Sequence, residues 1–447
     1  MWAAAGLLFA ASCLAGDFSH LFWDEPRWRG DLDTVYAARR NETFWLAHGQ
    51  LTPAARSLLD EMENAHRRGL LRADYDSTPL ATLVRSCAQA PGCGADTPRI
   101  DRAISLNVMR FVSDLHFGRV GRNSRESLRI ARTPLDWSDV FSRLRSSAGA
   151  AAALDALEPQ FGHYQLLKAA LAKYQAMPPS TQQRRHVMQI QLSMERIRWL
   201  PSPTQSPPII VNIPQFRLFA FQGLEDSAAS ILQMDVIVGS TFPGRRTPVF
   251  AAEMRSVVLN PYWDVPRSIA LAELLPKARK DAAWLDRNGY QLVDGPADAS
   301  SVVPATAENV GRLAAGTLRV RQLPGPNNAL GRVKFLLPNP YNVYLHDTPA
   351  PELFRRSRRA FSHGCIRLAD PMRLLHMVLA DQPEWSPARV SEALATGRPV
   401  RIALRTVRPV YILYGTALAL EDGRTLFFDD IYRLDAPLWA ELTSRHP

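Results

Sequence analysis

The sequence predicts an α+β multidomain protein, in which a helical part is followed by a mainly-β part with a helical insertion. Its 447 residues exceed one average domain, which favours two or three domains. Apolar side chains recur at three-to-four spacing before residue 200, and short β-branched and aromatic runs come after it. Residues 202–208 separate the two parts and read Ser-Pro-Thr-Gln-Ser-Pro-Pro, a composition typical of a linker.

Three segments of the first part show the helical period most clearly. Each places its apolar side chains on one face, as a helix packed against a core does. These residues are Leu58, Leu59, Met62 and Ala65 in 53–69, then Ile104, Val108, Phe111, Val112 and Leu115, and finally Val187, Ile190, Met194 and Ile197.

Strands are predicted in the second part at 209–213, 216–221, 234–238, 257–259 and 343–345. The charged segment 266–290 interrupts them with helical spacing, so we expect it to form an insertion that covers part of the sheet. Near the end of the chain, residues 410–420 and 425–432 flank Glu-Asp-Gly, which is a hairpin signal.

The chain is basic, with a net charge of +10 and a pI of about 9.7. Such a balance suits an anionic partner, which would be nucleic acid, a membrane surface or an acidic polymer. The sequence contains neither zinc-finger spacing nor a basic stretch interleaved with aromatic residues, and its arginines are scattered. We therefore expect no nucleic-acid binding.

The first sixteen residues form a short apolar run that ends in small residues. Cys13 and Ala15 are placed like the small pair that precedes a signal-peptidase cut, so we expect a signal peptide over residues 1–15 and export of the protein. The run is shorter than the roughly 20 apolar residues that span a bilayer. Two alternatives stay open, lipidation of Cys13 and a buried N-terminal helix.

Three further cysteines need an explanation in an exported protein. Cys87 and Cys93 bracket the turn-rich loop Ala-Gln-Ala-Pro-Gly, and in an oxidising compartment they could pair. The alternative is two free surface thiols. Cys365 is then left without a partner, which makes it a candidate for chemistry.

Cys365 follows Ser362-His363-Gly364 and precedes a predicted helix over 371–379. A thiol attacks as thiolate, and its ordinary pKa of about 8.5 requires a neighbouring base or positive potential. We expect His346, delivered from a separate strand, to be that base, because His363 is badly placed to reach back to the thiol. Gly364 permits a tight turn that can aim main-chain N–H groups at an oxyanion.

Other readings of these residues are weaker. Cys365 could be an inert core thiol, and His346, His363 and Cys365 could bind zinc, although their spacing matches no common zinc signature. Asp347 would point away from His346 if the strand continues, which argues against a role as third catalytic member. The sequence lacks a Gly-x-Ser-x-Gly elbow and the Walker and dinucleotide glycine motifs. We therefore expect neither a metal nor a cofactor.

His346, a gap of fifteen residues and then Ser-His-Gly-Cys at 362–365 resemble the signature of the L,D-transpeptidases, the YkuD-type enzymes that cross-link peptidoglycan. Further segments resemble the large Gram-negative branch of that family. They are Val-Asn-Ile-Pro at 211–214, Asn-Pro-Tyr-Trp-Asp-Val-Pro at 260–266, Val-Lys-Phe at 333–335, Tyr-Leu-His-Asp-Thr-Pro at 344–349 and, more loosely, Met-Glu-Arg-Ile-Arg-Trp-Leu-Pro at 194–201.

The resemblance implies a helical scaffold domain over 16–200 and a catalytic domain over 207–408, with a lid at about 260–325. Residues 409–447 would form a C-terminal β-hairpin extension. The branch usually carries a peptidoglycan-binding repeat between its domains, and residues 150–186 show none. The substrate would then be held by the catalytic groove and a basic surface.

The resemblance also implies roles for single residues. Cys365 would attack the diaminopimelate carbonyl of a tetrapeptide stem, with His346 as general base, and the backbone at 363–365 would form the oxyanion hole with support from Ser362. Substrate contacts would come from Arg367, Tyr344, Trp263 and Asn260. Anchoring of the loop by Arg367 and lid packing by Trp263 are the alternatives.

An amine of a second stem would then resolve the acyl-enzyme and give a 3–3 cross-link. The expected partners are therefore donor and acceptor peptidoglycan stems in the periplasm, together with periplasmic cell-wall synthases. Water or a free D-amino acid as acceptor stays open, because the same catalytic residues would serve. A non-catalytic wall-binding scaffold is a further alternative, although the intact pair of His346 and Cys365 argues against it.

Overall fold

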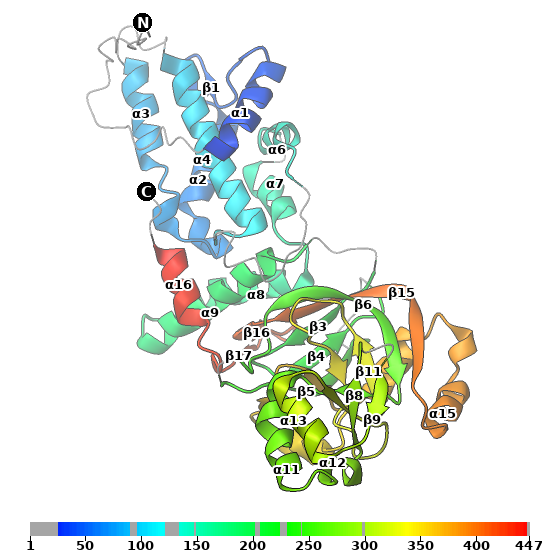
Figure 1. Ribbon diagram of the computed structural model, residues 1–447. Helices are drawn as coiled ribbons and strands as arrows, with labels where there is room; N and C mark the ends of the chain where they lie inside the picture. The colour runs from blue at the N-terminus through cyan, green and yellow to red at the C-terminus, as the bar shows by residue number, and fades with distance from the viewer. Residues whose placement is uncertain are drawn as a thin grey trace, which may run out of the picture. The chain divides into compact units, whose positions relative to one another are not determined.

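The computed structural model describes residues 26–89, 96–120, 134–146, 149–201, 206–223, 230–242, 244–296 and 300–444 (Figure 1). The chain divides into two compact units, one made of 1–202 with 415–447 and the other of 203–414. The first unit is mostly helical and the second is mainly β, which confirms the predicted fold class.

The first unit is built from helices, three of which begin at side-chain caps. The side chains of Thr52, Asp136 and Ser180 accept main-chain N–H groups at the starts of α2, α6 and α9. The helices are α1 (Pro26–Ala38), α2 (Pro53–Glu63), α3 (Thr78–Gln89), α4 (Thr97–Phe117), α6 (Trp137–Leu144), α7 (Ala150–Leu157), α8 (Gly162–Gln175), α9 (Thr181–Arg198) and α16 (Asp435–Thr443), with the short 3₁₀ turns Ala65–Arg68 and Arg72–Asp74.

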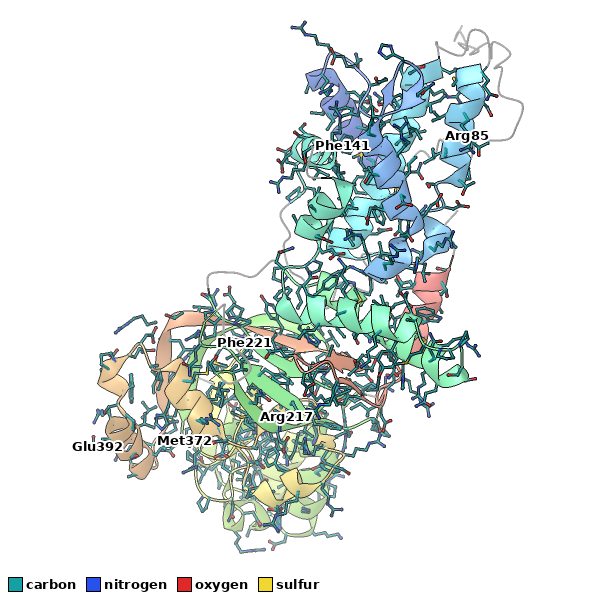
Figure 2. All side chains as sticks on the ribbon, turned by 180° about the vertical axis from the view of Figure 1, so that it is seen from behind. Arg85, Phe141, Arg217, Phe221, Met372 and Glu392 are labelled. Atoms are coloured by element: carbon teal, nitrogen blue, oxygen red, sulfur yellow. The ribbon has the colours of Figure 1, made fainter. Side chains whose placement is uncertain are left out.

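Aromatic side chains fill one end of this helical core. Phe141, labelled in Figure 2, packs edge-on against Phe44 and Trp45 with ring centroids 5.1 and 5.3 Å apart. The short strands β1 (Leu46–Ala47) and β2 (Gln50–Leu51) follow these rings in the chain. Asp101 on α4 accepts the N–H groups of Phe44, Trp45 and Leu46, so its buried carboxylate fixes this segment to the helix.

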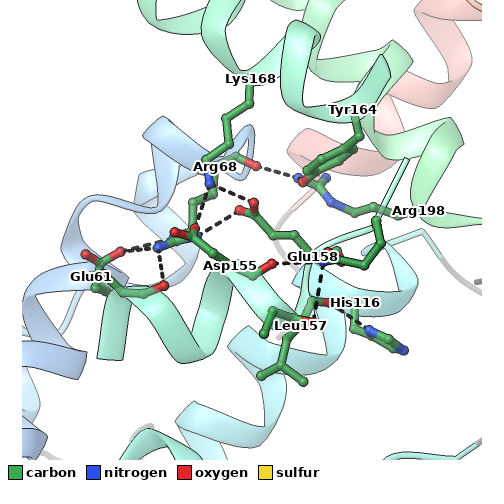
Figure 3. Close-up of polar contacts among 12 residues, drawn as sticks. Glu61, Arg68, His116, Asp155, Leu157, Glu158, Tyr164, Lys168 and Arg198 are labelled. Carbon is green, nitrogen blue, oxygen red and sulfur yellow. Dashed lines mark hydrogen bonds and ion pairs between the residues drawn. The ribbon is translucent and has the colours of Figure 1, made fainter. Parts of the chain in front are cut away.

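A buried ionic cluster joins α7 and α8 to the turn after α2 (Figure 3). Arg68 contacts Glu61, Asp155 and Glu158 at 2.8, 2.6 and 2.9 Å, and Lys168 contacts Glu158 at 2.6 Å. Glu158 is almost fully buried. Buried charges are tolerated only when they are paired, so this cluster holds the three segments in one arrangement.

The C-terminal segment contributes the hairpin of β16 (Ala417–Ala419) and β17 (Thr425–Phe427) to the first unit. The expected extension began at residue 409, whereas residues 409–413 are the end of β15 (Val400–Leu413) in the second unit. The structural boundary falls after Tyr414 because Val410–Leu413 pair with β3 and complete the large sheet.

The second unit is built around a nine-stranded sheet in the order β13-β5-β14-β12-β11-β6-β15-β3-β4. An additional pairing of β4 with β5 closes eight of these strands into a barrel, with β13 beside β5. The strands are β3 (Ile209–Asn212), β4 (Arg217–Ala220), β5 (Leu232–Gly239), β6 (Phe250–Leu259), β11 (Val333–Leu336), β12 (Leu345–His346), β13 (Ala360–Ser362), β14 (Ile366–Leu368) and β15.

The segment between β6 and β11, expected to be a lid and called the lid below, has an apolar core of its own. The helical insertion expected at 266–290 is present as α10 (Arg267–Ile269), a π-helical turn (Ala270–Leu274), α11 (Leu275–Lys280) and α12 (Trp284–Arg287). The lid also contains α13 (Ala307–Ala315) and a four-stranded sheet, which the sequence reading did not foresee. Its strands are β7 (Trp263–Asp264), β8 (Tyr290–Asp294), β9 (Ser301–Val303) and β10 (Arg319–Gln322).

Figure 1 shows α11, α12 and α13 gathered beside β8 and β9. The lid buries its own apolar cluster, which includes Leu274, Leu285 and Val320. Three short helices complete the second unit: the 3₁₀ turn Pro351–Arg355, α14 (Pro371–Val378) and α15 (Pro387–Ala395), with a further 3₁₀ turn at Pro383–Trp385.

Candidate active site

Three adjacent strands of the barrel bring the polar site residues together. Lys334 on β11 lies directly opposite His346 on β12, and His346 lies beside Arg367 on β14. Residues paired in this way point to the same face of a sheet. The row of Lys334, His346 and Arg367 therefore stands on one face of the barrel wall.

Cys365 and Tyr344 extend this row by one step along the strands. Cys365 lies directly before β14 and Tyr344 directly before β12, and Tyr344, Lys334 and Arg367 all act on the Cys365 thiol, which places the thiol beside this row. The intervening residues Val333, Phe335, Leu345, Ile366 and Leu368 are all but fully buried. The barrel interior is therefore apolar, and the thiol expected as nucleophile lies beside the row that holds the expected base.

His346 is held in one orientation by its own backbone. Its Nδ1 lies 2.6 Å from the carbonyl oxygen of Asp347, and since a carbonyl only accepts, Nδ1 carries the proton. The other ring nitrogen, Nε2, is then an acceptor that can take a proton from a nucleophile. The carboxylate of Asp347 instead accepts the main-chain N–H groups of Arg332 and Thr348 and so orders the turn. The imidazole is therefore oriented by the Asp347 carbonyl and not by its carboxylate.

Burial keeps His346 neutral. His346 is only 4% exposed. Desolvation is the main cause that lowers the pKa of His346 to about 3, and the nearby Arg367 guanidinium is the second. Burial likewise raises the pKa of the Cys365 thiol. At neutral pH the pair is therefore an uncharged thiol beside an uncharged base, and the proton moves when the thiol attacks.

Several groups counter the cost of forming the Cys365 thiolate. The main-chain N–H and the hydroxyl of Tyr344, followed by the charges of Lys334 and Arg367, act against burial and lower the pKa of the thiol. The thiol itself lies 3.7 Å from the carbonyl oxygen of Asn342. Tyr344, expected to contact substrate, is thus a direct partner of the nucleophile.

The loop before Cys365 is stabilised by short hydrogen bonds. Gly364 has φ of +122°, a region that favours glycine. Its N–H donates to Ser362 Oγ at 3.1 Å, and that hydroxyl donates to the carbonyl of Cys365 at 2.5 Å. The buried Thr247 hydroxyl donates to the Gly364 carbonyl at 2.8 Å and accepts the N–H of Gly239. Ser362 therefore supports the turn as expected. Its hydroxyl also accepts the N–H of Gly364, so this N–H is already hydrogen-bonded.

His363 points to the lid rather than to the thiol. Its Nε2 lies 2.8 Å from Glu273 Oε1, and Arg245 approaches the same carboxylate oxygen at 3.6 Å. Glu273 belongs to the π-helical turn of the lid, a distortion that is frequent at functional sites. Because His363 is engaged with Glu273, His346 is the better candidate for the base that serves Cys365.

Two of the expected substrate residues belong to the lid region. Trp263 is half-buried on β7 and acts to lower the pKa of Tyr344 against the burial that raises it, and its role toward substrate stays a prediction. Asn260 does not reach the site, because its amide nitrogen donates to the carbonyls of Ala393, Leu394 and Arg398 at 3.1–3.2 Å. The expectation that Asn260 binds substrate is not supported, since this buried amide anchors the end of α15.

Cys87 on α3 is buried and disulfide-bonded. Its expected partner Cys93 lies outside the described residues, as does Cys13. Among the residues that the structure describes, no cluster of three or more His, Cys, Asp or Glu side chains could hold a metal ion. Within the same ranges, no helix has the length and apolarity needed to cross a membrane.

Sequence reasoning missed Lys334, Thr247 and Glu273 as residues near the nucleophile. Lys334 stands inside the quoted Val-Lys-Phe run, and a lysine in an otherwise apolar strand was a readable signal. Thr247 and Glu273 are more than 90 residues away in the chain and meet the loop only through the fold.

A thiol, a base with a free ring nitrogen and a tight glycine turn are the parts that cysteine-dependent acyl transfer requires. Residues 207–402 match the family model described as the L,D-transpeptidase catalytic domain, YkuD, and residues 30–171 match a Scaffold domain. The chain therefore combines a YkuD-type L,D-transpeptidase catalytic domain with a Scaffold domain.

A relative from Haemophilus influenzae supports this assignment. It is named "Putative L,D-transpeptidase" and is 27% identical over 404 residues, which cover 90% of this chain and 78% of the relative.

Proposed function

We propose that this protein is a peptidoglycan L,D-transpeptidase that forms 3–3 cross-links through an acyl-enzyme on Cys365. The observation that carries the proposal is the placement of Cys365 at the start of β14 while His346 stands on the paired strand β12, with Nδ1 of His346 bound to a carbonyl. The match to the L,D-transpeptidase catalytic domain supplies the class of substrate.

In the first half-reaction, Nε2 of His346 takes the Cys365 proton as the sulfur attacks the carbonyl of the third residue of a tetrapeptide stem. The bond from this carbonyl to the nitrogen of D-alanine then breaks, and the imidazolium returns its proton to the departing amine. Because the Gly364 amide is bound to Ser362, the amides of His363 and Cys365 would serve the oxyanion.

In the second half-reaction, a side-chain amine of another stem attacks the thioester. His346 takes the proton of this amine and gives it to the sulfur as Cys365 leaves. An acceptor site that admits amines and excludes water is required for transfer to outcompete hydrolysis.

Export through residues 1–15 would place the protein in the periplasm. There it would meet its donor and acceptor stems and the cell-wall synthases. Lipidation of Cys13 would add membrane association.

The test uses the purified full chain with tetrapeptide muropeptides, and the products are separated by chromatography and identified by mass. We expect 3–3 linked dimers from the wild type and none from Cys365→Ala. Release of D-alanine with tripeptide stems as the only product would identify a carboxypeptidase instead, and incorporation of added D-amino acids would identify an exchange enzyme. An unchanged substrate would contradict all three activities.

A further inference from the structure

Two positive side chains near the nucleophile have no acidic partner. Neither Lys334 nor Arg367 forms an ion pair or a hydrogen bond within the described parts of the chain, and the Nε atom of Arg367 is buried without a partner. The ammonium of Lys334 instead stands over the Tyr344 ring, 4.0 Å from its centroid.

This arrangement is costly for an empty site. Both side chains are half-buried, and burying a cation without a hydrogen-bonded counter-charge is unfavourable. Asp264 of the lid is the acidic residue whose charge acts on Lys334, but its carboxylate pairs with Arg319 at 3.1 Å. The neutral thiol of Cys365 and the neutral His346 offer no negative charge at rest.

The register places these two cations on either side of the base. Lys334 and Arg367 belong to the strands that flank β12, and both pair with His346. Strands lie about 4.8 Å apart, so the two Cα atoms are separated by roughly 10 Å and the long side chains can converge on one anion above the imidazole. The fork of Arg367 suits the planar, two-oxygen shape of a carboxylate.

We propose that Lys334 and Arg367 together form a carboxylate-binding site beside Cys365, and that Lys334 is its second, previously unassigned half. The identity of its occupant rests on the proposed function: it is the free carboxylate of the residue that leaves the donor stem, one peptide unit beyond the attacked carbonyl. Amide or ester donors without that carboxylate would leave both cations unpaired, which makes the site a specificity determinant for donors with a free C-terminus.

The first experiment probes the charge without any peptide substrate. The rate of Cys365 alkylation in the full chain is measured with anionic iodoacetate and with neutral iodoacetamide, by mass mapping of the Cys365 peptide. The ratio of the two rates cancels changes in thiolate content, because both reagents need the same thiolate. We expect the ratio to fall about five- to tenfold in Lys334→Met, as one charge-assisted contact is lost, and to be largely kept in Lys334→Arg.

Lys280→Met is the matched control, since Lys280 is an exposed lysine on α11 outside the site. Its ratio should equal that of the wild type, and circular dichroism of each variant checks that it is folded. An iodoacetate preference that is unchanged in Lys334→Met would overturn the proposal. So would an equal fall in Lys280→Met, because the effect would then come from net charge alone.

The second experiment compares a tetrapeptide donor with the same donor amidated at its C-terminus. We expect kcat/KM of the wild type to drop about tenfold or more on amidation, and Lys334→Met to show little further discrimination between the two donors. Equal discrimination by both proteins would contradict the occupant we assign. A wild type that prefers iodoacetate but turns over neither donor would refute the proposed function and still support the anion site.

Discussion

The buried base makes the stability of the second unit depend on pH in a defined way. Folding lowers the pKa of His346 from 6.5 to about 3, mainly through desolvation. Between these two values the unfolded chain binds a proton that the folded chain does not, so stability rises with pH across this window. The contribution of neutral His346 to the free energy of unfolding is complete above pH 6.5, and it is lost progressively as the pH falls toward 3.

The size of the effect follows from the same two values. At pH 5 almost all unfolded chains carry a proton on this imidazole and almost no folded chains do, which costs the fold about 2 kcal/mol relative to pH 7. His346→Gln removes the titration and keeps an N–H that can reach the Asp347 carbonyl. The variant should therefore lack this part of the pH dependence.

The assay is urea unfolding of the wild type and of His346→Gln at pH 7 and pH 5. Taking the difference between the two proteins cancels the histidines that they share. We expect the wild type to lose about 2 kcal/mol more than the variant between these pH values. Equal losses would refute the reasoning, because they would mean that His346 takes up a proton as readily in the folded protein as in the unfolded chain.

Four substitutions test single contacts of the fold and the site. Tyr344→Phe removes the hydroxyl that donates to the sulfur, so iodoacetamide should alkylate Cys365 about tenfold more slowly at pH 7; an unchanged rate would contradict this contact. Glu273→Ala should lower kcat/KM by roughly three- to tenfold, because the loop before Cys365 loses its hydrogen bond through His363. Glu273→Gln keeps a hydrogen-bonding group and should rescue part of this loss, whereas equal losses in both variants would show that the negative charge of Glu273 matters and the hydrogen bond does not. Arg68→Ala should destabilise the first unit by about 1–3 kcal/mol in urea unfolding, since the buried carboxylate of Glu158 loses one of its two cationic partners and keeps Lys168; an unchanged stability would show that Lys168 alone satisfies it. Asn260→Ala should cost about 1–3 kcal/mol of stability in the second unit and leave KM unchanged, whereas a raised KM would restore its role in substrate binding.

The two candidate catalytic residues, Cys365 and His346, could be selected from the sequence because their local chemistry is distinctive. A lone thiol after Ser-His-Gly and a histidine at the end of an apolar run are unusual enough to stand out. The strand that follows Cys365 shows the period-two alternation, since Ile366 and Leu368 are buried while Arg367 between them is half-buried.

The supporting groups could not be predicted, since they act through the backbone or across the fold. The partner of His346 is a carbonyl, which every residue possesses, so no side-chain pattern marks it. The lid strands are two to five residues long, too short to show a period, and β7 pairs with β10 across more than 50 residues. Asn260 was misjudged because an asparagine near a site and one that caps a distant helix look alike in the sequence.

The central claim is that Cys365 forms a covalent bond to the carbonyl of a donor stem. Its most direct test is the intact mass of the full chain mixed with a tetrapeptide donor and quenched in acid within seconds, followed by mapping of the modified peptide. We expect an adduct of the stem without its terminal D-alanine on Cys365, and no adduct in Cys365→Ala. An adduct on another residue, or D-alanine released with full activity by Cys365→Ala, would contradict it.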